Sequence, residues 1–212
     1  NVHLATRGFA IGVSTLRNVY IDGETFDATI AVTDPAGDPV ATDLTLEVLE
    51  RTVVNGKRGE RHVETLEVAS NKDTGEATRT LRIDKAGNYI IRATGTDQFG
   101  NRLSGSHNVS ISGDDDRIRL RLLADKHQYK VGDSAEIKVH WREDPALALV
   151  TYEGASILGY QLVTLKKGSN KLTVPMASRL APNFTLSVAV MHGSRLHETA
   201  SDFWVTRKLT IT

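Results

Sequence analysis

Apolar and polar residues alternate with a period of two along most of the chain. Leu44, Leu46 and Val48 occupy every second position, and the same period recurs over residues 78–83 and 118–122. This period places one face of a β-strand on a core and the other in water. Residues 63–68 begin in alternation and lose phase at Thr65. No long stretch has a convincing 3.6-residue apolar stripe, so the pattern predicts strands almost throughout.

Clusters of Gly, Asn, Asp and Pro separate these runs. They lie at residues 34–39, 55–56, 73–75, 85–88, 99–101 and 167–170. Gly and Asn tolerate a positive φ and Pro presets φ, so each cluster predicts a chain reversal. Reversals about every 8–15 residues are typical of antiparallel sandwiches. The sequence therefore predicts an all-β fold built from immunoglobulin-like β-sandwiches.

A tyrosine-glycine motif occurs twice, 109 residues apart. Tyr20 and Tyr129 each begin the pattern Tyr-x-x-Gly-acid-hydroxyl, which precedes an alternating strand at residues 26–33 and 135–141. In both copies we expect the glycine, Gly23 or Gly132, to have a positive φ and the tyrosine to be packed with its hydroxyl on a backbone group. A period of this length fits one sandwich per repeat.

The repeat predicts two tandem domains. We place them at residues 1–112 and 113–212, divided at the polar hinge Ser112-Gly113-Asp114-Asp115-Asp116. The first carries 12 basic and 15 acidic residues and the second 14 and 11. Each domain is long enough to bury a core of its own.

Composition excludes several classes of function. The chain has 26 basic and 26 acidic residues, so no net field steers it to nucleic acid or to an anionic membrane. It has no Cys, which excludes disulfides, a thiol nucleophile and cysteine-ligated metal sites. The longest apolar run, Ala146 to Val150, is far shorter than a membrane span. The chain starts at Asn1 without a visible leader, and we expect it to be a piece of a longer protein.

Candidate metal sites are few. The seven histidines are scattered, at His3, His62, His107, His127, His140, His192 and His197. A zinc site needs three or four convergent ligands, and no spacing here supplies them, so we expect surface or turn histidines. Asp114, Asp115 and Asp116, with Asp125 nearby, could coordinate Ca²⁺ between the domains. The simpler interpretation is a solvated, extended acidic hinge.

Catalytic patterns are also lacking. The sequence contains neither a Gly-x-Ser-x-Gly elbow nor a phosphate-binding Gly-x-x-x-x-Gly-Lys. Glu143 and Asp144 with Asp202 could be imagined as a carboxylate pair for glycoside hydrolysis. Adjacent residues on a strand, however, point to opposite faces. We predict no enzyme, no catalytic, cofactor-binding or metal-binding residue, and no cofactor.

Two tryptophans and two sequons complete the candidates. Trp141 and Trp204 could stack on sugars or fill a pocket of a partner if exposed. We expect them to pack in a core or between domains instead. Asn108-Val109-Ser110 and Asn183-Phe184-Thr185 are glycosylation sequons by rule.

Several elements of the second half, in order, resemble the bacterial α2-macroglobulin family. They are Tyr129-x-x-Gly132-Asp133, the run Ala148-Leu149-Val150-Thr151-Tyr152-Glu153, Ile157-Leu158-Gly159-Tyr160, Leu172-Thr173-Val174-Pro175 and residues 181–188. The similarity is to macroglobulin domains before or within the bait-region section. The first half resembles such a domain more loosely, through residues 32–40 and through Ala86-Gly87-Asn88-Tyr89 with residues 96–101.

This resemblance implies two macroglobulin-like domains that form a non-catalytic scaffold in a larger protein that traps or inhibits proteases. That protein would be exported, to a bacterial periplasm, the cell envelope or the extracellular space. The family's thioester joins Cys to Gln, and with no Cys this chain cannot hold it. The partners implied are other domains of the parent chain and, through the full-length protein, a target protease. The alternative is a tandem immunoglobulin-like adhesion or glycan-binding module of a cell-surface protein.

Overall fold

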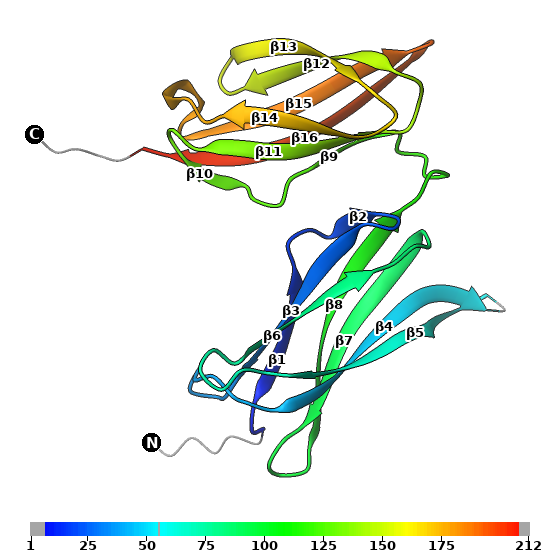
Figure 1. Cartoon of the computed structure of the whole chain (residues 1–212), viewed down its shortest axis with the longest axis vertical. Helices are drawn as coiled ribbons and strands as arrows, with labels where there is room; N and C mark the ends of the chain where they lie inside the picture. The colour runs from blue at the N-terminus through cyan, green and yellow to red at the C-terminus, as the bar shows by residue number, and fades with distance from the viewer. Residues whose placement is uncertain (1–6, 55, 208–212) are drawn as a thin grey trace, which may run out of the picture. The chain divides into compact units, whose positions relative to one another are not determined.

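The computed structural model describes residues 7–54 and 56–207, and it is almost entirely β-structure (Figure 1). The described residues form sixteen strands and one three-residue 3₁₀ helix, η1 (Ser178–Leu180). They divide into two compact units, Asn1–Gly113 and Asp114–Thr212, called unit 1 and unit 2 below. The prediction of an all-β sandwich fold is confirmed. His3 and Asn55, named above, lie outside the described residues.

Unit 1 is a sandwich of a three-stranded and a five-stranded sheet. The smaller sheet has the order β1 (Ala10–Thr15), β3 (Thr25–Thr33), β6 (Glu76–Arg82). The larger has the order β2 (Val19–Ile21), β8 (Arg102–Ser112), β7 (Gly87–Thr96), β4 (Asp43–Val54), β5 (Lys57–Ala69). All pairs are antiparallel except β2 with β8.

Unit 2 repeats this arrangement strand for strand. Its smaller sheet has the order β9 (Leu120–Leu123), β11 (Ser134–Trp141), β14 (Gly168–Pro175). Its larger sheet has the order β10 (Gln128–Lys130), β16 (Arg195–Thr206), β15 (Asn183–His192), β12 (Ala146–Glu153), β13 (Ile157–Leu165). Again one pair is parallel, β10 with β16. The sequence repeat thus corresponds to one eight-stranded topology used twice.

Each unit has its own core between its two sheets. In β4 the alternating Leu44, Leu46 and Val48 are all buried, as their period predicts. In unit 2 the largest fully buried side chain is Trp141 on β11, whose indole N–H donates to the carbonyl of Asp144 at 2.7 Å. Every residue of either buried cluster belongs to one unit.

The loss of phase in residues 63–68 is a β-bulge. Val48 pairs with Glu64 and Leu49 pairs with His62, so Val63 has no partner on β4. A bulge adds one residue to one strand and shifts the alternation that follows. Leu66 and Val68 pair with the buried Leu46 and Leu44 and face the core, whereas Val63, at the bulge, is exposed.

Candidate functional site

The two tyrosine-glycine turns have the same hydrogen bonds. Gly23 and Gly132 have φ of 72° and 97°, as predicted. Glu24 accepts from the backbone N–H of Ile21 at 3.0 Å, and Asp133 accepts from that of Lys130 at 2.9 Å. The N–H of each glycine donates to a neighbouring chain segment, at Ile83 and Met176 respectively. The motif acid thus closes the turn in both units, which is a structural role.

The tyrosines of these turns are buried. Tyr20 stacks on Phe26 with ring centroids 4.1 Å apart, and its hydroxyl accepts from the N–H of Arg17 at 3.0 Å. The Arg17 guanidinium also lies 4.5 Å from the Tyr20 ring and pairs with Glu24 at 2.6 Å. Tyr129 packs against Phe203. These contacts anchor the start of the sandwich, and neither ring is available to a ligand.

Two arginines bind part of the acidic segment at 114–116, whose Asp114 and Asp115 are exposed. Arg119 donates to the carbonyl oxygens of Asp114 and Asp116, at 2.8 and 3.1 Å, and pairs with Glu143. Arg121 pairs with the carboxylate of Asp116 at 2.6 Å. The Asp116 carboxylate is therefore not a free, solvated charge, because Arg121 pairs with it, and Arg119 binds its backbone carbonyl. Among the described residues no group of three or more His, Asp or Glu is arranged to hold a metal ion.

The histidines at 192 and 197 meet on Trp141. Their rings lie 5.7 and 5.4 Å from its centroid in edge-to-face orientation, because the β15–β16 hairpin brings them together. The hydrogen bond from Arg119 lowers the pKa of the nearby Glu143, with smaller contributions from both histidines. Trp141 is packed, as expected, and the pair of histidines covers its edge.

The fold separates the two carboxylates that could have formed a catalytic pair. Glu143 is committed to Arg119, whereas Asp202 accepts from the Thr185 hydroxyl at 2.6 Å on the outward face of β16. They do not form a carboxylate pair. Trp204 is half exposed on β16, where its position alternates with the buried Phe203 and Val205, so it does not lie in the core of unit 2. Asn108 and Asn183, of the sequons, are exposed.

The carboxylate of Asp97 was missed at the sequence level. It accepts from the N–H groups of Gly8, Phe99 and Asn101 at 2.8–2.9 Å and from the Asn101 amide at 3.0 Å. Burial raises its pKa, but these hydrogen bonds outweigh burial and lower the pKa to about 2. The signal was an Asp that opens the turn at residues 97–101. This turn and residues 7–9, just before β1, border a groove of about 420 Å³ that is also lined by the exposed Phe99.

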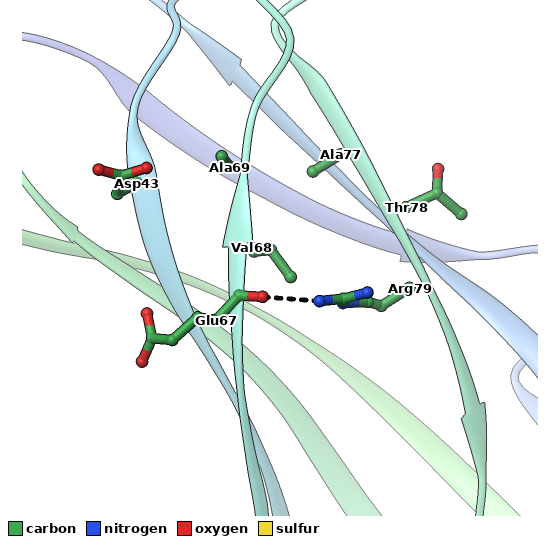
Figure 2. A pocket seen from close by; sticks show the side chains of 7 residues that line it. All are labelled: Asp43, Glu67, Val68, Ala69, Ala77, Thr78 and Arg79. Atoms are coloured by element: carbon green, nitrogen blue, oxygen red, sulfur yellow. Dashed lines mark hydrogen bonds between the residues drawn. The ribbon is translucent and has the colours of Figure 1, made fainter.

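A second groove lies at the open edge of unit 1, between β5 and β6 (Figure 2). It measures about 530 Å³, and small side chains such as Val68, Ala69 and Ala77 line most of it. Arg79 reaches across and donates to the backbone carbonyl of Glu67 at 2.9 Å. The arginine therefore ties the edge strands of the two sheets together. The groove holds no pairing of a nucleophile with a base.

The comparisons with known proteins assign unit 2. Residues 120–207, nearly all of that unit, match the family model described as alpha-2-macroglobulin bait region domain. Unit 2 of this chain is an alpha-2-macroglobulin family domain. That family is one of protease traps and inhibitors, not of catalytic enzymes.

The remaining comparisons add little to this. The solved structure of Escherichia coli alpha-2-macroglobulin activated by porcine elastase is similar over 97% of this chain, at 14% identity and a TM-score of 0.41. This chain spans 22% of the length of that one. No curated protein matches the sequence. Among the described residues, no helix is long and apolar enough to cross a membrane.

Proposed function

We propose that this chain is a non-catalytic scaffold segment of a larger α2-macroglobulin-like protein that traps proteases. The observation that carries the proposal is the bait region domain match across residues 120–207. The polar side chains described above support it, because they close turns, pair with one another or cap strands. A rigid sandwich of this kind would hold the protease-sensitive and reactive parts of the parent in place.

We further propose that unit 1 is a second macroglobulin-like domain, so that the domains are residues 1–112 and 113–212. The identical strand order of the two units supports this, and so do the equivalent hydrogen bonds of their tyrosine-glycine turns. The parent would be exported, to the periplasm, the cell envelope or the extracellular space, where it would meet foreign proteases.

The test compares this chain with the full-length parent. A trap encloses its protease, so the parent should inhibit elastase on a large protein substrate and leave cleavage of a small chromogenic peptide nearly intact. The isolated 212-residue chain should change neither rate, because it lacks most of the enclosing structure. Elastase is the first probe, followed by a panel of serine and metalloproteases.

Two results would overturn the proposal. One is a parent that leaves every protease of the panel fully active on protein substrates. The other is hydrolytic activity in the isolated chain. Glycan binding by the isolated chain, measured on an array, would favour the adhesion module instead.

A further inference from the structure

The outward face of the large sheet of unit 2 is apolar. Six large side chains, each between 42% and 72% exposed, project from it: Leu147, Leu149, Tyr160, Leu162, Met191 and Leu196. We call this set the apolar face. Single exposed apolar residues are normal on a protein surface, whereas a contiguous group marks a contact site.

The strand register makes the group contiguous. Leu149 on β12 pairs with Leu162 on β13, and Met191 on β15 pairs with Leu196 on β16. Leu147 lies two positions from Leu149 and therefore on the same face. Tyr160 stands two positions from Leu162 in the same way. The six side chains thus come from four adjacent strands of one sheet.

The fold itself does not require this face to be apolar, because the corresponding face of unit 1 has the same topology and is more polar. On the corresponding face of unit 1, Leu49 and Ile90 are buried, and the exposed large apolar side chains of β4 and β5 are Val53 and Val63, at 66% and 47%. Polar groups on the same face interact with one another. Arg92 pairs with Glu60 at 2.9 Å, and Arg51 donates to Asn108 at 2.8 Å. The outward face of unit 1 thus carries paired polar side chains, whereas the one in unit 2 carries a contiguous apolar group.

Charge indicates what could cover the apolar face. The outward positions of this sheet carry the acids Glu153, Glu198 and Asp202. Within its described strands, the one outward cation is Lys130, on the edge strand β10. A second copy would bring like charges together, and an anionic membrane would be repelled. A surface with apolar side chains bordered by Lys or Arg is complementary to it.

We propose that the apolar face is a docking surface for another domain of the parent chain, one that presents apolar side chains with a basic rim. The proposal rests on the proposed function in one respect, that this chain is part of a larger protein. The docking surface goes beyond the proposed function, because it assigns the contact to one sheet face of unit 2 and states the chemistry of the partner surface.

Hydroxyl-radical footprinting tests the proposal on the wild-type proteins. Tyr160 and Met191 are reactive and exposed, so their oxidation rates in the isolated chain should be high. In the full-length parent both rates should fall severalfold. High salt weakens charge complementarity, so it should raise both rates in the parent and leave those in the isolated chain unchanged. Equal rates in parent and isolated chain would overturn the proposal.

Variants give a second measurement. Leu149→Lys in the parent should restore the Tyr160 and Met191 oxidation rates to those of the isolated chain. Leu16→Lys is the matched control, since Leu16 is 71% exposed, belongs to unit 1 and is not part of the apolar face, and it should leave both rates low. Restoration by both variants, or by neither, contradicts a specific dock. Each variant's melting temperature is measured in the isolated chain, where both substitutions should be tolerated.

Other occupants would give different results. Self-association of the isolated chain that Leu149→Lys abolishes would assign the face to a second copy. Binding to phosphatidylcholine vesicles, lost in the same variant, would assign it to a membrane. Either result overturns the proposal. Protection of Tyr160 in a parent that traps no protease would uphold the docking surface and refute the proposed function, and trapping without protection would do the reverse.

Discussion

At the scale of single residues, the turn glycine Gly132 is required by its backbone conformation alone. Its φ is 97°, and an added Cβ would meet nothing within 4 Å. Gly132→Ala should therefore destabilise unit 2 by about 1–2 kcal/mol, the cost of a left-handed conformation for a residue with a Cβ. Both tryptophans lie in unit 2, so urea unfolding followed by tryptophan fluorescence reports on this unit.

Gly159 is the matched control for this substitution. Its φ is outside the positive range, and an added Cβ would make only ordinary contacts, at 3.6 Å to Tyr152 and 3.7 Å to Arg179. Gly159→Ala should shift the free energy of unfolding by less than about 0.5 kcal/mol. An equal loss in both variants would mean that backbone strain is not the cause.

The Asp97 carboxylate should make unit 1 sensitive to acid. Its pKa is about 2 in the folded state against an ordinary 3.8, so its stabilising effect is complete above 3.8. As pH falls from 3.8 to about 2 the folded state loses this contribution, because the unfolded state binds the proton more readily. Asp97→Asn should remove that part of the pH dependence and lower the stability of unit 1 at neutral pH.

The measurement is thermal unfolding by circular dichroism across this pH range, with tryptophan fluorescence following unit 2 in the same samples. Asp38→Asn is the control, since Asp38 is exposed in the turn before β4. Its hydrogen bonds to Asp34 there use its backbone N–H and carbonyl, which the substitution keeps. If the difference between wild type and Asp97→Asn is the same at pH 2 and pH 7, the carboxylate does not act as described.

At the scale of elements, the two tryptophans separate core from surface. Trp141 is fully buried in β11, so Trp141→Ala should cost about 3–5 kcal/mol through lost burial and a cavity. Trp141→Phe should cost less than Trp141→Ala, because it keeps a buried aromatic ring. It still loses the hydrogen bond to the Asp144 carbonyl. Trp204→Ala is the control and should cost under about 1 kcal/mol. Urea unfolding followed by circular dichroism measures all three, and similar losses for Trp141→Ala and Trp204→Ala would contradict this assignment.

The period-two pattern of apolar residues predicted burial correctly where one face of a strand meets a core. It predicted burial poorly at a β-bulge and at an exposed aromatic side chain. The alternation in β4 predicted its buried residues correctly. The bulge at Val63 was visible only as a lost phase, because a bulge is defined by pairing with β4. Trp204 lies outside the core because β16 places Phe203 and Val205 inward and leaves the larger ring outside.

At the scale of the whole molecule, each unit should fold alone. The two buried clusters share no residue, and each fills the space between the sheets of its own unit. Fragments 1–113 and 114–212 should each give a dispersed amide spectrum and a cooperative unfolding transition. A fragment 114–212 that aggregates or unfolds without cooperativity would show that its core is incomplete without unit 1.

The sequence by itself determined the all-β class, the reversals, the repeat and the exclusion of cysteine chemistry. These follow from local rules, namely side-chain period, the φ preferences of Gly and Pro, and composition. The α2-macroglobulin resemblance also came from residues in the order they occur. Tertiary structure alone decided which side chains meet, namely Arg119 with the acidic segment and His192 with His197 on Trp141. It also turned the short apolar run at 146–150 into a strand with apolar side chains on both faces, because only the pairing of β12 with β13 and β15 shows that one of those faces is left uncovered.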